Sequence, residues 1–108
     1  MAATRITLPN GAVRAGTLVE LQLLIAHPME TGYRADDQGQ VLPRNILRRF
    51  SCHYLDQLVV ELDLFPAIAA NPYLAFSLVA QRSGPLRFRW EGDQGFVQQE
   101  ERWLEVQA

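Results

Sequence analysis

The chain has 108 residues and a mass of 12.2 kDa, which suffices for one domain with a single hydrophobic core but not for two. Its formal net charge of -2 and isoelectric point near 5.6 exclude the strongly basic surface that nucleic-acid binding requires. The only cysteine, Cys52, excludes an internal disulfide framework and a cysteine-rich zinc site. Residues 1–108 are therefore expected to form one domain stabilised by an ordinary core.

No stretch approaches the ~20 consecutive apolar residues that a membrane-spanning helix needs. The opening residues, Met1 to Arg5, also lack the basic and apolar regions of a signal peptide. From its own residues, the chain is expected to be cytoplasmic and to bind no membrane.

Short runs in which apolar residues recur at every second position fill most of the chain, which is the spacing of half-buried strands. They occur at residues 6–8, 19–25, 50–54, 58–64, 74–80, 86–90 and 96–106. Residues 55–57 predict one hairpin turn and residues 92–95 a second. About seven antiparallel strands in two sheets predict an all-β, immunoglobulin-like β-sandwich.

Three of these segments carry more specific expectations. Alternation places the side chains of Leu58, Val60, Leu62 and Leu64 on one inward face, and those of Leu86, Phe88 and Trp90 on another with Arg87 and Arg89 outward. Except for Ser77, the run 74–80 is apolar at both parities, which predicts a strand with both faces covered or with one face meeting a partner, and a central place in its sheet. Residues 66–72 begin and end with proline, and we expect one helical turn there.

The longest irregular stretch runs from His27 to about Asn45, and long loops in small domains are often functional. His27, Glu30 and Tyr33 have side chains suited to metal or acid–base chemistry, but the chain has only two histidines and no third ligand at a recognisable spacing. We expect no metal and no cofactor. Two explanations stay open: a partner-binding loop, or a loop whose polar groups bond to local backbone.

Three other groups of residues have a chemical and a structural explanation. Ser51, His53 and Asp56 suggest a catalytic triad, but Ser51 and His53 lie along one strand with no sign of an oxyanion hole, so a solvated or sheet-facing strand is favoured. Cys52 shares its parity with Phe50 and Tyr54, which predicts a buried, unreactive thiol rather than a persulfide-forming sulfur carrier. A third group is the basic cluster of Arg34, Arg44, Arg48 and Arg49. It either grips an anionic partner or pairs with Asp36 and Asp37.

Four motifs occur in order between residues 27 and 73: His27-Pro-Met-Glu-Thr-Gly32, Pro43-Arg-Asn-Ile46, Phe50-Ser-Cys52 and Pro66-Ala-Ile-Ala-Ala-Asn-Pro-Tyr73. Together they resemble the SoxZ family, the Z subunit of a sulfur-compound carrier complex. The resemblance implies a non-catalytic subunit that binds SoxY, whose mobile C-terminal arm carries the substrate-bearing cysteine. It also implies transient contact with other Sox proteins, and a periplasmic location reached by export together with SoxY.

The motifs that match the family best are the expected places of partner contact, namely His27, Met29, Glu30, Tyr33, Arg34, Asn71 and Tyr73. A second set of expected contact residues follows from the alternation along the strands. Leu24, Val59, Ala75 and Val79 are apolar, but each has the parity opposite to that of the core residues in its strand. Such positions are expected to be exposed and, with the nearby tyrosines and arginines, to form one apolar patch for SoxY. In isolation, the chain is expected to cover this patch by homodimerising.

Overall fold

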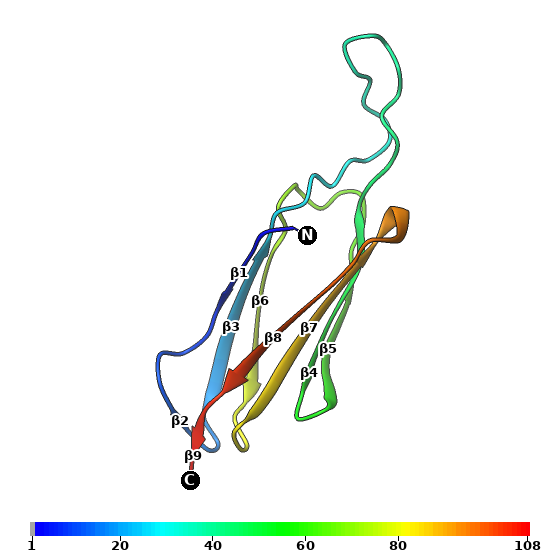
Figure 1. The fold of residues 1–108 in the computed structure, drawn as a ribbon. Coiled ribbons are helices and arrows are strands. Elements are labelled where there is room, and N and C mark those ends of the chain that lie inside the picture. The colour runs from blue at the N-terminus through cyan, green and yellow to red at the C-terminus, as the bar shows by residue number, and fades with distance from the viewer. Residues whose placement is uncertain (1) are drawn as a thin grey trace.

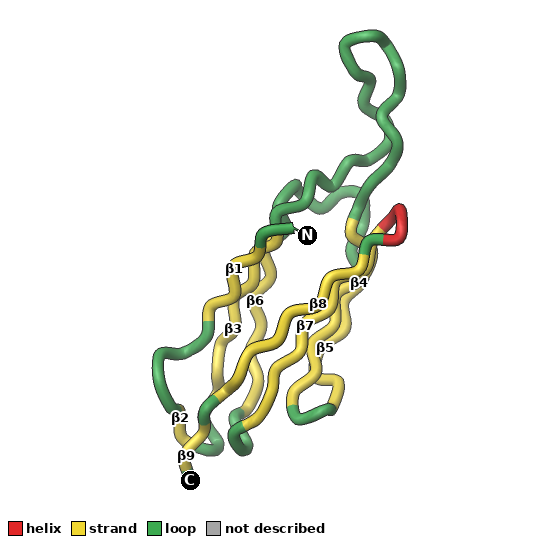
Figure 2. The backbone as a smooth tube through the Cα atoms, viewed as in Figure 1, coloured by secondary structure: helices red, strands yellow, loops and turns green. Residues whose placement is uncertain are grey.

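The computed structural model describes residues 2–108, so that Met1 of the opening segment lies outside the described residues. This part of the chain forms nine strands and one short 3-10 helix (Figures 1 and 2). The elements are β1 (Thr4–Thr7), β2 (Val13–Arg14), β3 (Leu18–Ile25), β4 (Leu47–Tyr54), β5 (Gln57–Asp63), β6 (Tyr73–Val79), β7 (Gly84–Gly92), η1 (Asp93–Gly95), β8 (Val97–Leu104) and β9 (Val106–Gln107).

Seven strands of four or more residues form two antiparallel sheets, in the orders β1-β3-β6 and β5-β4-β7-β8. The two-residue strands β2 and β9 add a short parallel pair. The two sheets face each other (Figure 1). A cluster of buried side chains lies between them, which is the arrangement of an immunoglobulin-like sandwich. The predicted fold class is therefore confirmed. No helix in residues 2–108 is long and apolar enough to cross a membrane.

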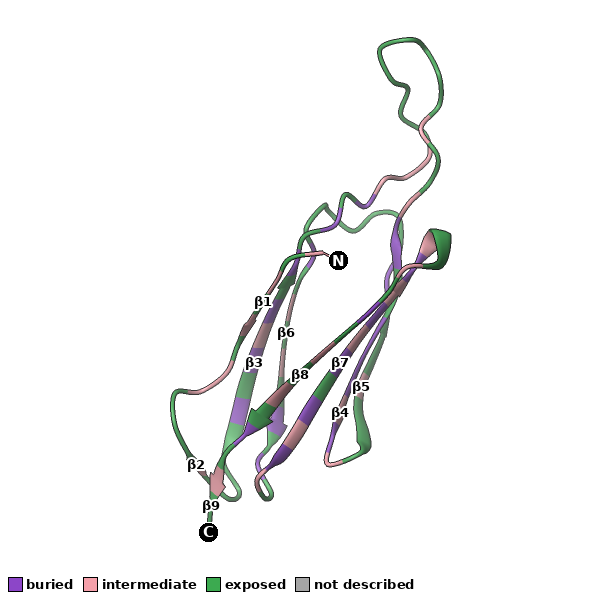
Figure 3. Cartoon of the chain, viewed as in Figure 1, coloured by how far each residue is buried: buried purple, intermediate pink, exposed green. Residues whose placement is uncertain are grey.

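The core lies between the sheets, and the inward faces of β3, β4 and β7 are those that the alternation predicts (Figure 3). Ser51 of β4 departs from the pattern, because it has the outward parity but is buried. Phe88 of β7 lies opposite Cys52 of β4, and Trp90 lies opposite Phe50. Phe50 also contacts Phe76 of the other sheet, with ring centroids 6.0 Å apart. Buried side chains from β3 complete the core, namely Val19, Leu21, Leu23 and Ile25.

The predicted inward face of β5 is only partly correct. Val60 is half buried and Leu64 is buried, but Leu58 and Leu62 are exposed. The cause at Leu58 is a bulge, because the register shifts between Cys52 and His53 and pairs Leu58 with the outward-facing His53. Leu62 has the inward parity but lies on a strand at the sheet edge, where only one neighbouring strand shields it.

Two further expectations are wrong. The strand β6 is an edge strand that pairs with β3 alone, although its near-continuous apolarity predicted a central position. Residues 66–72 contain no helical turn; they form a tight turn in which the Ile68 amide donates to the Phe65 carbonyl at 3.0 Å. The case of β6 shows that apolar residues at both parities need not mean burial on both faces.

Candidate functional site

The long loop between β3 and β4 projects beyond the end of the sandwich (Figures 1 and 2). Together with this loop, the molecule measures 60 × 22 × 22 Å along its principal axes. Two antiparallel β-bridges join the outgoing and returning segments of the loop, one between Glu30 and Asn45 and the other between Ala35 and Val41. At the first bridge, the Glu30 amide donates to the Asn45 carbonyl at 2.8 Å and the Asn45 amide donates back at 2.7 Å.

His27 lies at the base of this loop. Its backbone is hydrogen-bonded to Asn71, which belongs to the other motif expected to contact a partner. The His27 amide donates to Oδ1 of Asn71 at 3.0 Å, and the Asn71 amide donates to the His27 carbonyl at 2.8 Å. The His27 side chain is buried, with its ring edge-on to Phe96 at 5.4 Å between centroids. Its Nδ1 accepts a hydrogen bond from the Met29 amide at 3.1 Å, so this ring is engaged in shaping the loop.

Burial lowers the pKa of His27 below its ordinary value, and the charge of Asp93 opposes the effect only partly. The neutral imidazole is therefore the favoured form, which agrees with a ring nitrogen that accepts a hydrogen bond. Met29 is also buried, and its sulfur accepts a hydrogen bond from the Leu47 amide at 3.2 Å. Neither side chain is available to a partner in this conformation.

The outer half of the loop presents exposed side chains. Tyr33 is 90% exposed, and the Arg34 guanidinium pairs with the Glu30 carboxylate at 2.6 Å. The hydrogen bond from Arg34 lowers the pKa of Glu30, although its slight desolvation acts in the opposite direction. At the tip, Asp36 Oδ1 accepts hydrogen bonds from the Gln38 and Gln40 amides, both at 2.9 Å. These contacts give the tip a defined shape.

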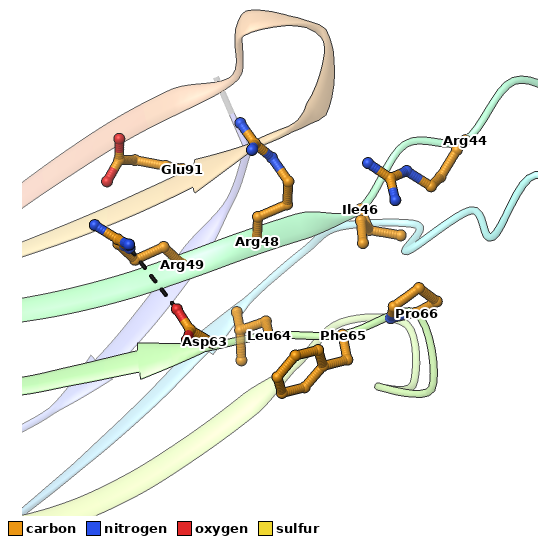
Figure 4. Close-up of a pocket in the computed structure, with 9 residues that line it drawn as sticks. All are labelled: Arg44, Ile46, Arg48, Arg49, Asp63, Leu64, Phe65, Pro66 and Glu91. Carbon is orange, nitrogen blue, oxygen red and sulfur yellow. Dashed lines mark ion pairs between the residues drawn. The ribbon is translucent and has the colours of Figure 1, made fainter.

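The predicted basic cluster lies partly in an open cleft of about 500 Å³ at the base of the loop (Figure 4). Asp93 of η1 forms ion pairs with two arginines of the cluster. Its Oδ2 lies 2.8 Å from Arg44 Nε, and its Oδ1 lies 3.3 Å from Arg48 Nε. Desolvation raises the pKa of Asp93, but hydrogen bonds from Arg44 and the Ile46 amide, with both arginine charges, lower it below its ordinary value. Asp93, which the sequence interpretation missed, therefore offsets part of the positive charge of Arg44 and Arg48 at this cleft.

The alternative in which the arginines pair with Asp36 and Asp37 is wrong for the ion pairs that the structure describes. Arg34 pairs with Glu30, and Arg49 lies 3.8 Å from Asp63 on β5. The partners come from distant strands and turns, so no local pattern in the sequence could have named them. Arg44, for example, reaches an aspartate 49 residues further along the chain.

The outer face of the sheet β1-β3-β6 carries the predicted apolar positions Leu24, Tyr73 and Val79, all of them exposed. Cross-strand register places Leu24 beside Tyr73 at one end of the sheet. Val79 lies at the opposite end, beside Leu18. Leu18 is 68% exposed and was missed, although its parity is that of Leu24.

The predicted single patch is therefore two separate apolar pairs. Between them lie Glu20 and Gln22, whose side chains are hydrogen-bonded to each other at 2.8 Å, opposite Ser77 and Ala75. Val59 is exposed as expected but belongs to the other sheet, on β5. Tyr33 lies on the loop between β3 and β4 and so belongs to neither pair.

The residues considered for catalysis are not arranged for it. Cys52 is fully buried, as predicted, and burial raises the pKa of its thiol to about 12. Asp56 is bonded to Arg87 rather than to His53. Among residues 2–108, no group of three or more histidine, cysteine or acidic side chains is placed to hold a metal ion.

The strand order and these surfaces define an immunoglobulin-like β-sandwich with a projecting loop and an exposed sheet face. The family model described as sulphur oxidation protein SoxZ matches residues 6–102. The chain belongs to the SoxZ family of sulfur oxidation proteins, which confirms the resemblance seen in its motifs.

Solved structures share the fold. The superoxide reductase (neelaredoxin) from Ignicoccus hospitalis superposes with a TM-score of 0.71 at 14% identity, over 98% of this chain and 82% of that one. The sulfur carrier protein SoxY from Chlorobium limicola f thiosulfatophilum gives 0.67 at 15% identity, over 98% and 80%. At such identities the likeness concerns the fold alone. No curated protein sequence matches the chain.

Proposed function

We propose that this chain is a non-catalytic subunit that binds SoxY, and that the complex presents covalently bound sulfur intermediates to the enzymes of thiosulfate oxidation. The observation that carries the proposal is the match to the SoxZ family over residues 6–102, a range that includes the long loop and nearly all of both main sheets. The proposal includes transient contact with other Sox proteins and a periplasmic location reached by export with SoxY.

The surroundings of Cys52 support a subunit whose covalent chemistry belongs to its partner. A sulfur carrier needs an accessible thiolate, because the thiolate is the nucleophile. Cys52 has no exposed surface, and a pKa of about 12 keeps it protonated at neutral pH. The rival function as a stand-alone carrier through Cys52 therefore has no support in the structure.

The surroundings of His27 give as little support to a small hydrolase or metal protein. Its ring is buried, accepts a hydrogen bond from the Met29 amide and faces Phe96. By contrast, Tyr33, Tyr73 and Val79 are each at least half exposed. Exposed aromatic and apolar side chains on a defined scaffold are suited to protein contact.

The test is co-expression of the chain with tagged SoxY, followed by titration of the purified partners. We expect co-purification, and Val79→Asp or Tyr73→Ala should raise the dissociation constant by about tenfold or more if these side chains lie in the interface centre. Val97→Asp is the matched control, because Val97 is exposed to the same degree as Val79 but lies on β8 of the other sheet.

Circular dichroism separates loss of binding from loss of the fold. If well-folded wild-type chain does not co-purify with SoxY, the proposed function is wrong. If it binds but all three variants bind as tightly as wild type, the binding surface lies outside the face of β1-β3-β6.

A further inference from the structure

The strand β6 is an edge strand without the usual protection. Edges are commonly protected by charged residues, proline, bulges or shortness, because their free backbone groups can pair with another chain. The seven residues of β6 include no charged residue, no proline and no glycine, and they pair with β3 without a register shift. The other three edges of the two main sheets differ: β1 has four residues, β5 has a bulge and two acidic residues, and β8 has three charged residues.

The hydrogen bonds at its two ends show which backbone groups of β6 are free. The Ile25 amide donates to the Pro72 carbonyl at 3.3 Å, and the Ala80 amide donates to the Thr17 carbonyl at 2.8 Å. Because successive residues of a strand point their backbone groups to opposite sides, the even-numbered residues between them face β3. The amides and carbonyls of residues 73, 75, 77 and 79 therefore point to the open edge.

The side of the sandwich formed by β5 and β6 is open as well. On the opposite side, Ala2 before β1 and Gln98 of β8 exchange two hydrogen bonds, at 3.0 and 2.9 Å, which link the two sheets. No such bond joins β5 to β6 in the described part of the chain. Instead, the β5 side presents exposed apolar side chains, namely Leu58, Val59 and Leu62.

We propose that β6 pairs antiparallel with β6 of a second copy, around a two-fold axis at Phe76. This register pairs Tyr73 with Val79 and Ala75 with Ser77 of the other copy, so all four residues with free backbone groups find partners. The two sheets then continue as one six-stranded sheet in the order β1-β3-β6-β6-β3-β1. The strand is self-complementary in this register, because large apolar residues meet large ones and small residues meet small ones.

The same register explains the two separate apolar pairs on the outer face. Leu24 lies beside Tyr73, and Val79 lies beside Leu18, within one chain. When Tyr73 of one copy faces Val79 of the other, the four side chains form an apolar row across the dimer, and the two-fold axis repeats this row at the other end of the sheet. The exposed groups of one chain thus match those of a second copy, which is why a second copy is the occupant assigned to this edge.

Light scattering with size-exclusion chromatography tests the pairing on the isolated full chain. Wild type should give twice the 12.2 kDa of one chain. Two double variants at exposed positions provide the matched comparison, since position 75 of one copy faces position 77 of the other. A75K/S77K places like charges opposite each other twice, whereas A75K/S77E places opposite charges there. The first should have a dimer dissociation constant at least about tenfold higher than the second.

Each other outcome overturns the proposal. A wild-type monomer at every accessible concentration excludes the dimer, and equal dissociation constants for the two variants place the interface elsewhere. The inference does not depend on SoxY binding, which is titrated separately with the same variants. If the isolated chain is monomeric and only A75K/S77K loses SoxY, the edge belongs to SoxY rather than to a second copy.

Discussion

His27 and Asn71 belong to two motifs that lie 44 residues apart, and the structure joins them by reciprocal hydrogen bonds. Their positions in the sequence identified both as notable but gave no sign that they contact each other. Asn71 has a φ of 53° and Met29 a φ of 50°, both in the left-handed region that asparagine tolerates better than most residues. The pair fixes where the long loop leaves the sandwich.

The lowered pKa of His27 predicts a pH-dependent stability. The folded state disfavours the protonated ring, so the unfolded state binds more protons as the pH falls through the ordinary histidine value of 6.5. The free energy of unfolding should therefore be highest above that value and should decrease on acidification from about pH 7.5 to about pH 5.5. Urea titrations at several pH values measure this decrease.

His27→Asn is the control for this prediction, because the asparagine side chain retains a hydrogen-bond acceptor but does not titrate. Its free energy of unfolding should change less over the same interval. Glu30 and Asp93, whose pKa values are also lowered, lose their contribution below their ordinary values of 4.5 and 3.8 and so do not interfere. A variant with the same pH dependence as wild type would assign the effect to other groups.

At the scale of the elements, β7 follows its predicted alternation fully. Leu86, Phe88 and Trp90 are buried, while the side chains of Arg87 and Arg89 are about half exposed. Phe88→Ala should lower the free energy of unfolding by about 3–5 kcal/mol, since it removes a buried ring and leaves a cavity. Denaturant titration gives the value.

Arg87→Ala is the neighbouring control. Arg87 pairs with Asp56 and Glu101 on the solvent side, and exposed ion pairs of this kind contribute about 0–1 kcal/mol. A loss below about 1 kcal/mol for Phe88→Ala would mean that the ring does not fill the core as described.

How far the sequence predicts each strand depends on where the strand lies. Alternation identified the buried faces of β3, β4 and β7 because each has a neighbouring strand on both sides. It failed at β5, where a bulge changes the register, and it placed β6 in the centre although β6 is an edge. Parity reports which side chains share a face, but not whether another strand lies beside them.

In the whole molecule, the two long sides of the sandwich differ. One side is linked by the hydrogen bonds between Ala2 and Gln98 and by the pairing of β2 with β9. The other side is open along β5 and β6 and carries most of the exposed apolar strand positions. The sequence could not predict this asymmetry, because it depends on which strands become edges of the sheets. The contact proposed between two copies of the chain lies on the open side, at β6.

The projecting loop also divides the chain into two pieces that hold each other. A cut near Gln38 would separate β1, β2 and β3 from all later strands, yet β3 would still be paired with β6 at seven positions and would still bury Val19, Leu21, Leu23 and Ile25. Protease-nicked protein should therefore elute from a native column as a single species and release its two fragments only in denaturant. The two halves, produced as separate polypeptides, should then be able to reassemble into one sandwich.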